Sequence, residues 1–285
     1  LNPDFVVITG DLVYGQLYPG EYRREYRKCW EILQEFQVPI YICPGNHDGY
    51  IQLRDDGFKY WREYFGPLYY SFDYGKSHFI CANSYDWSDS MRRSFLFIPL
   101  NWGGCVSDEQ VSWIENDLLN SSGSKLKVML IHHNPIWDTE RDSLLGLSYH
   151  NREKLLSIIE DHGVDAVLSG HVHFDSVTTH GDTLFITTTT SCSNPGAEDA
   201  YWGYRMITVR NYTIVSYNYR EPKYSIPLYH IDCREEGAYG KLIENKLDIN
   251  ITVTVNFLVP KGRYIVSNGT IKMIREKNNM MEVYV

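Results

Sequence analysis

The sequence predicts an α/β protein whose sheets are covered by helices, followed by a small β-rich module. Over the first half of the chain, short apolar runs rich in β-branched residues alternate with amphipathic segments. From about residue 173 onward the pattern is mostly that of strands. The pattern changes again after Pro222. We therefore expect a main domain over residues 1–222 and a β-rich extension or partial module over 223–285.

The helices are predicted from their periodicity and from their ends. Pro19 suits a first helical position, Ser107 begins a capping-box pattern, and Gly163 suits the end of a helix. Helices are expected at 19–36, 57–65, 107–119 and 152–162. Strands are expected at 5–9, 38–43, 69–74, 78–83, 127–131 and 164–168, and later near 173–180, 183–189, 203–209, 212–219, 247–259 and 263–285 with a turn at Asn268-Gly269. The aperiodic segments 84–106 and 134–150 are expected to be loops.

Composition limits the classes of protein that the chain can belong to. Of its 285 residues, 43% are hydrophobic, which is enough for a sizeable core. The formal net charge of −9 argues against broad binding to nucleic acid or to anionic membranes. None of the six cysteines forms a CxxC pair, so we expect buried free thiols and no thiolate zinc site. The pattern shows no transmembrane segment and does not indicate an oligomeric state.

The compartment is only weakly indicated by the sequence. Triplets of the form Asn-x-Ser/Thr begin at Asn120, Asn211, Asn250 and Asn268, which favours an exported or cell-surface protein. The chain begins at Leu1 without an initiator Met and enters an apolar strand almost at once. We therefore expect it to be part of a longer protein.

Polar side chains follow four of the predicted buried strands, at the point where each strand ends. Ligands in α/β proteins bind beyond the carboxyl ends of strands, so these side chains are expected at one edge. Each has an ordinary explanation by itself, as a turn, a helix cap or a hydrogen-bonded core histidine. Together, oxygen and imidazole donors without thiolate suit Mn, Fe, Zn or Co. The clusters are Gly10-Asp11, Gly45-Asn46-His47-Asp48, His132-His133 and Gly170-His171-Val172-His173.

These clusters resemble the motifs of the calcineurin-like metallophosphoesterase superfamily, over residues 1 to about 220. The resemblance implies a four-layer αββα fold, in which two packed mixed sheets are flanked by helices. It implies hydrolysis of phosphate mono- or diesters of small molecules by hydroxide activated at two metal ions, either two divalent ions or Fe(III) with a divalent ion. A small-molecule phosphoester is therefore the expected substrate, and nucleic acid is not expected as a partner.

The same resemblance implies a role for each matching residue. Asp11 would bridge the two metals, and His173 would bind one of them. Asn46, His132 and His171 would complete the other. His47 would contact the phosphate and donate a proton to the leaving alkoxide, which is general-acid catalysis.

The resemblance also raises one expectation about what is missing. The first motif of the family, Asp-x-His or Asp-x-Gly on an upstream strand, is absent because the chain begins at Leu1. We expect the chain given to hold the metal beside Asn46, to bind the other metal poorly and to be impaired in catalysis. The intact parent is expected to bind two metals.

Two alternatives to this interpretation stay open. Tyr14 fits the purple acid phosphatase pattern, in which a tyrosine at this position ligates ferric iron. We favour an aromatic residue beside the site, because Phe174 after His173 and His133 after His132 do not resemble a plant purple acid phosphatase. The other alternative is a non-catalytic binding or surface module that has kept the fold.

Some further residues are candidates for supporting the metal ligands or for contacting substrate. Asp48 and His133 adjoin predicted site residues, and Asn83 follows a predicted strand. The loops 84–106 and 134–150 are expected to set specificity, and their candidates are Trp87, Trp102, Trp137 and His150.

Overall fold

The computed structural model describes residues 3–15, 20–53, 55–194, 196, 202–220, 231–237, 239–245, 253, 255–277 and 280–285. The chain divides into two compact units, Leu1–Arg220 and Glu221–Val285. Each unit is described by itself. The assignment of catalysis to residues 1–222 stays a prediction.

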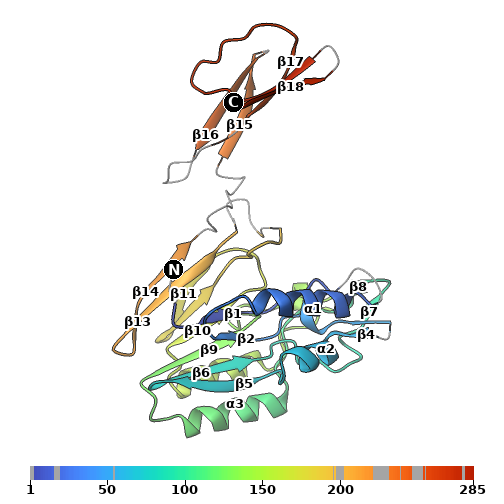
Figure 1. The fold of residues 1–285 in the computed structure, drawn as a ribbon. Helices are drawn as coiled ribbons and strands as arrows, with labels where there is room; N and C mark the ends of the chain where they lie inside the picture. The colour runs from blue at the N-terminus through green and yellow to red at the C-terminus, as the bar shows by residue number, and fades with distance from the viewer. Residues whose placement is uncertain are drawn as a thin grey trace. The chain divides into compact units, whose positions relative to one another are not determined.

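A six-stranded mixed sheet forms the centre of the first unit (Figure 1). Its four inner strands are parallel, and an antiparallel hairpin partner closes each edge. The hairpins turn at Gly75 and Gly181, which both have positive φ. The spatial order is β11 (Ser176–His180), β12 (Thr183–Thr187), β10 (Ala166–Ser169), β9 (Leu126–Ile131), β6 (Ser77–Ala82) and β5 (Tyr70–Tyr74).

Two helices, α3 (Asp108–Asn120) and α4 (Arg152–Asp161), cover one face of this sheet. Their apolar stripes join side chains from the sheet in one buried cluster, which includes Ile114, Leu155 and Met129. The predicted start of α3 is confirmed, because the Ser107 side chain accepts a hydrogen bond from the Gln110 backbone N–H.

The opposite face of the sheet packs against two further strand pairs. β1 (Val6–Ile8) and β2 (Ile40–Ile42) are parallel, and β13 (Tyr204–Arg210) and β14 (Thr213–Arg220) are antiparallel. Side chains from both pairs join one cluster with the six-stranded sheet, and the Tyr41 and Phe72 rings stack across it with centroids 3.4 Å apart. This second layer is therefore made of two hydrogen-bonded pairs.

Helices α1 (Glu21–Leu33) and α2 (Gly57–Tyr64) form the outer layer on the β1–β2 side. Figure 1 shows α1 and α3 on opposite sides of the strands. The order helix, sheet, sheet, helix agrees with the predicted fold class, which is confirmed. Helix α1 is shorter than the predicted range 19–36, and its buried residues are Tyr22 and Tyr26.

The segment 84–106 is more ordered than the predicted surface loop. Tyr85 and Val106 at its ends are fully buried. Between them lies a short hairpin of β7 (Ser94–Phe95) and β8 (Ile98–Pro99). The other short elements of this unit are β3 (Ile51–Gln52), β4 (Asp55–Asp56), η1 (His47–Gly49) and η2 (Glu140–Asp142).

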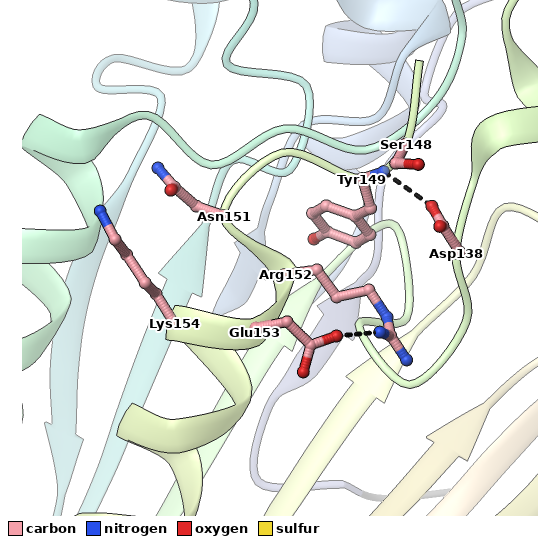
Figure 2. Close-up of a pocket in the computed structure, with 7 residues that line it drawn as sticks. All are labelled: Asp138, Ser148, Tyr149, Asn151, Arg152, Glu153 and Lys154. Carbon is pink, nitrogen blue, oxygen red and sulfur yellow. Dashed lines mark hydrogen bonds and ion pairs between the residues drawn. The ribbon is translucent and has the colours of Figure 1, made fainter. Parts of the chain in front are cut away.

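A surface pocket lies where α4 begins (Figure 2). Its positive charges are paired, since Arg152 contacts Glu153 and Lys154 lies 2.8 Å from Asp108. Paired charges of both signs do not select for an anion, so this pocket is not the candidate phosphate site. It is lined by Asp138, Ser148, Tyr149, Asn151, Arg152, Glu153 and Lys154.

The second unit is made of strands in its described part. The chain bends at Asn268-Gly269 as predicted, and Asn268 has a positive φ, but this bend comes before the last two strands, whose antiparallel pairing places their own connection after Lys277. Two strands, over residues 231–236 and 240–245, lie outside the individual strand ranges that were predicted for the β-rich extension, and part of the predicted strand 247–259 lies outside the described residues. The strands are β15 (Ile231–Glu236), β16 (Gly240–Asn245), β17 (Asn256–Pro260), β18 (Met273–Lys277) and β19 (Met280–Tyr284).

Cysteines and glycosylation triplets can be compared with their predictions. Cys43, Cys81 and Cys105 are buried free thiols, as expected, whereas Cys192 is exposed and the Cys233 side chain lies outside the described residues. The triplet residues Asn120, Asn211 and Asn268 are exposed. No helix in the described ranges combines the length and apolar character needed to cross a membrane.

Candidate metal centre

Four predicted metal ligands meet where their strands end. Asp11 follows β1, Asn46 follows β2, His132 follows β9 and His171 follows β10. The Nε2 atom of His132 lies 3.1 Å from Asn46 Oδ1 and 3.2 Å from Asp11 Oδ2. The Nδ1 atom of His171 lies 3.0 Å from the same Asn46 oxygen. The two sheets therefore bring His171 into contact with Asn46, which lies 125 positions before it in the sequence.

The ring nitrogens that point away from this cluster are held by the protein. His132 Nδ1 donates to the Thr9 carbonyl at 2.6 Å, and His171 Nε2 donates to Asp142 Oδ2 at 3.1 Å. Carbonyl and carboxylate oxygens only accept, so each neutral ring directs its other nitrogen, with a lone pair, toward Asn46. The Asn46 amide nitrogen donates to the Tyr50 hydroxyl, which turns its oxygen to the same point. Converging lone pairs of this kind fit a metal cation.

The charges in the cluster follow from burial and from each other. Burial alone raises the pKa of Asp11, but the attraction of His132 and His47 outweighs it and holds this pKa well below its usual range. For His132, burial lowers the pKa, and the charge of Asp11 more than reverses this effect and raises it. Burial lowers the pKa of His171. A cation bound here would take the place of the proton that Asp11 stabilises on His132.

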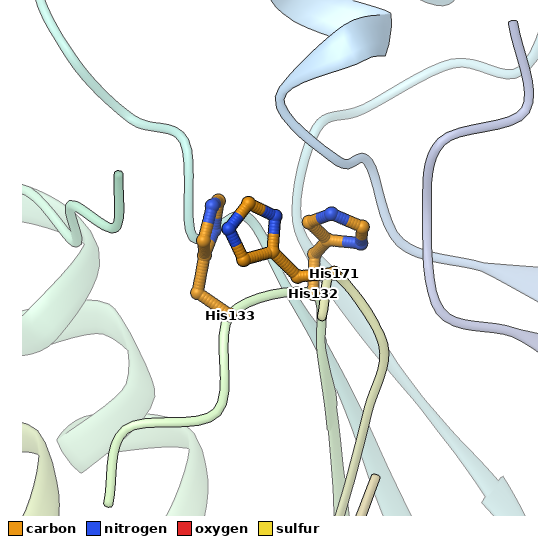
Figure 3. A group of neighbouring side chains, drawn as sticks. All are labelled: His132, His133 and His171. Atoms are coloured by element: carbon orange, nitrogen blue, oxygen red, sulfur yellow. The ribbon is translucent and has the colours of Figure 1, made fainter. Parts of the chain in front are cut away.

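His133 completes a group of three imidazoles whose nearest nitrogens lie within 4.8 Å of one another (Figure 3). Both of its ring nitrogens are already used. Nδ1 lies 2.7 Å from the Ser84 hydroxyl, and Nε2 donates to the Trp102 carbonyl at 2.9 Å. Burial, together with the charges of His171 and His132, lowers the pKa of His133 and keeps it neutral. His133 therefore packs beside His171, with a ring separation of 4.2 Å, and is not assigned as a ligand.

Asp48 joins the two loops that carry Asp11 and Asn46. Its fully buried carboxylate accepts backbone hydrogen bonds from Asp11 at 2.8 Å, Leu12 at 2.9 Å and Gly45 at 2.7 Å. Burial and the neighbouring Asp11 charge raise the pKa of Asp48 to about 7. Gly45 is required at its position, because a Cβ there would lie 2.1 Å from Asp11 Oδ1.

His47 is half-buried and is fixed by its backbone and by one ring nitrogen. Its Nδ1 donates to the Tyr14 carbonyl at 2.6 Å, which leaves Nε2 available to a substrate. Its backbone N–H donates to Asp11 Oδ1 at 3.0 Å. The Tyr22 hydroxyl donates to its carbonyl at 2.9 Å, so α1 helps to hold this turn in place.

Tyr14 and His173 have partners outside the cluster. The Tyr14 ring lies 5.4 Å from the His47 ring and the side chain is 52% exposed. His173 has a positive φ, and its Nδ1 donates to the Asn194 carbonyl at 2.7 Å, so the backbone holds the same ring nitrogen as in His132. Within the described residues, no contact joins either side chain to the four converging donors.

Asn83 and His150 contact other residues. Asn83 is fully buried, and its side-chain oxygen accepts the Tyr85 N–H, so that it shapes the turn after β6. His150 is exposed, with its ring 6.0 Å from the Trp87 ring. Trp137 packs 5.7 Å from Phe174, close in sequence to His173. The roles of these residues in substrate binding stay predictions.

Sequence reasoning missed Asp142 as a hydrogen-bond partner of His171, a predicted metal ligand. Asp142 lies in η2, within the loop 134–150, and its carboxylate meets His171. Its backbone carbonyl also accepts the Trp102 N–H at 2.8 Å. No motif marks this aspartate, so only its place in a loop predicted to border the site could have drawn attention to it.

The αββα fold of this chain, with oxygen and imidazole donors at its strand ends, is typical of metal-binding phosphoesterases. The profile of the calcineurin-like phosphoesterase family matches residues 1–175. The chain belongs to this family, and the predicted superfamily is confirmed. Calcineurin-like phosphoesterases and purple acid phosphatases use metal ions.

Individual relatives include both phosphodiesterases and phosphatases. The chain is 26% identical over 196 residues to a probable cyclic nucleotide phosphodiesterase of Coxiella burnetii, which covers 66% of this chain and 68% of that protein. It is 22% identical over 203 residues to purple acid phosphatase 15 of Arabidopsis thaliana, covering 60% of this chain and 35% of that protein.

One solved structure has a similar fold. The purple acid phosphatase PPD1 from yellow lupin (Lupinus luteus) seeds matches with a TM-score of 0.51 at 15% identity, over 85% of this chain and 46% of that one. The chain thus spans less than half the length of these two purple acid phosphatases.

Proposed function

We propose that this protein hydrolyses phosphate monoesters or diesters at a centre of two metal ions. The observation that carries the proposal is the convergence of Asn46 Oδ1, His132 Nε2 and His171 Nδ1, with the far nitrogen of each ring held by an acceptor. Asp11 adds a carboxylate oxygen to the same point. These four residues would hold one metal, and Asp11 with His173 would contribute to the other.

Bound metal ions would lower the pKa of water and neutralise charge on the phosphate oxygens. The remaining chemistry is assigned to the chain's own side chains. His47 holds a proton on Nδ1 for the Tyr14 carbonyl, so Nε2 is the atom that gives a proton to the departing alcohol oxygen. Asp48 accepts hydrogen bonds from the backbone of both loops, and these bonds hold Asp11 and His47 in position relative to each other.

The test separates metal binding from proton transfer. Metal-free protein is loaded with Mn, Fe, Zn or Co, and turnover is measured with p-nitrophenyl phosphate and with bis(p-nitrophenyl) phosphate. We expect Asn46→Ala and His171→Ala to lose metal and turnover together. We expect His47→Ala to keep its metal and to lose about 10²–10⁴-fold in turnover. His180→Ala, on the exposed edge strand β11, is the control.

Two results would contradict this assignment. If His47→Ala loses metal while its rate per bound metal is unchanged, His47 is a ligand and not the proton donor. If metal-loaded protein hydrolyses neither ester, the non-catalytic alternative is the better one. The purple acid phosphatase alternative requires a visible absorption band that disappears in Tyr14→Phe.

A further inference from the structure

The β7–β8 hairpin exposes a continuous run of apolar side chains. Phe95 is 66% exposed, Leu96 is 74% exposed and Ile98 is 58% exposed. In the neighbouring loop, Leu144 is 61% exposed and Leu145 is also exposed. Contiguous apolar surface of this kind is uncommon on a water-exposed face and marks a site of interaction.

The tip of this hairpin has an unfavourable local structure. Phe95 pairs with Ile98, so Leu96 and Phe97 form a two-residue turn with φ values of 46° and 68°. Turns of this type favour Asn-Gly, because side chains with a Cβ are disfavoured at positive φ. A turn built from Leu and Phe is therefore unfavourable both for backbone conformation and for solvation, which indicates a role for its apolar surface.

The apolar hairpin is connected to the metal centre by main-chain hydrogen bonds. The Leu144 N–H donates to the Leu100 carbonyl at 3.0 Å, directly after β8. Two residues further along, the Trp102 N–H donates to the Asp142 carbonyl at 2.8 Å. The Asp142 carboxylate binds His171. The apolar surface and a metal ligand therefore belong to one hydrogen-bonded group of loops.

Two exposed arginines flank the apolar surface. Arg93 directly precedes the hairpin, and Arg141 lies three residues before Leu144. Within the described ranges neither guanidinium has an ion-pair partner, whereas Arg92 is buried against Asp56 at 2.8 Å. Guanidinium groups beside an apolar protrusion suit the phosphates of lipid headgroups.

We propose that this hairpin inserts into the interface of a zwitterionic lipid bilayer, and that the esters acted on at the metal centre are phosphoesters at the membrane surface. The second half of this statement rests on the proposed function. A lipid surface is favoured over a protein partner because the tip carries no side-chain donor or acceptor, and leucine is under-represented at the centres of protein interfaces. The net charge of −9 favours zwitterionic over anionic lipid.

Vesicle flotation with the whole chain tests the docking surface. Wild-type protein, Leu96→Asp and Leu119→Asp are each mixed with phosphatidylcholine vesicles at low and at high salt. Leu119 is the matched control, because it is a leucine with 54% exposure at the end of α3. We expect the wild type and Leu119→Asp to float with the vesicles at both salt concentrations. We expect Leu96→Asp to bind about tenfold less or weaker still.

Three results would overturn the docking proposal: no flotation of the wild type, equal loss in both variants, or a wild-type dimer that Leu96→Asp converts to monomer without any vesicle binding. Turnover of a water-soluble ester keeps the two proposals apart. Leu96→Asp should retain that turnover while losing activity toward a phospholipid in vesicles. Flotation without hydrolysis of any ester would contradict the proposed function and leave the docking surface standing.

Discussion

Replacing Asp142 should weaken metal binding even though this residue is not itself a ligand. Its carboxylate accepts the Nε2–H of His171, which fixes the tautomer and leaves Nδ1 free to bind a cation. In Asp142→Asn an amide oxygen can still accept this proton, but the negative charge is lost. In Asp142→Ala both are lost. The order of metal affinity is therefore expected to be wild type, then Asn, then Ala.

The size of the effect follows from the geometry of this contact. Loss of a hydrogen-bond partner behind a metal-binding histidine typically lowers metal affinity about 10–100-fold, or roughly 1.4–2.7 kcal/mol. The separation of 3.1 Å is near the long end for a charged hydrogen bond, and the Asp142 side chain is 31% exposed. Both facts place Asp142→Ala in the lower half of this range, at about 10–30-fold. Asp142→Asn should lose less than this.

Calorimetric titration of the metal-free protein with Zn²⁺ or Mn²⁺ measures these affinities. Nitrogen NMR of His171 in the metal-free protein gives a second measurement, because the ring should become a mixture of tautomers when its acceptor is removed. Glu140→Gln, an exposed change in the same short helix, is the control. Affinities within twofold of wild type for both Asp142 variants, with the His171 tautomer unchanged, would refute the reasoning.

Three further predictions concern the loops around the cluster. Asp48→Asn should lower the free energy of unfolding by roughly 2–4 kcal/mol in urea titrations, because one carboxylate oxygen and its two backbone donors lose their hydrogen bonds; a change under 0.5 kcal/mol would be inconsistent with this role. Gly45→Ala should lower metal content about tenfold or more, since its Cβ would overlap Asp11 Oδ1, whereas full metal occupancy would mean that the loop can move aside. Because Asp11 raises the pKa of His132, metal affinity should be highest above that raised pKa and fall as pH drops through it; a flat pH profile for Zn²⁺ binding would contradict this.

The sequence by itself predicted the alternation of strands and helices and the four residues whose side chains converge. The strand predicted at 127–131 is apolar from Val128 to Ile131, which indicates burial on both faces, and the polar residues that follow such strands are then expected at the sheet edge. Asp11, Asn46, His132 and His171 could be predicted because each lies just beyond the end of such a strand. Their meeting point then follows from the parallel order of the strands.

Only the tertiary structure showed which residues of distant segments contact each other. Asp142 and His171 are 29 residues apart, and Asp48 reaches Leu12 across 36 residues. No periodic pattern in the sequence predicts either contact, because the conformation of a loop depends on hydrogen bonds to segments that are distant in the sequence. The same reason explains why His133, adjacent to a ligand in sequence, uses its nitrogens for Ser84 and Trp102. The left-handed turn at Leu96 and Phe97 could not be predicted either, since residue preferences oppose it and only the folded loops hold it in place.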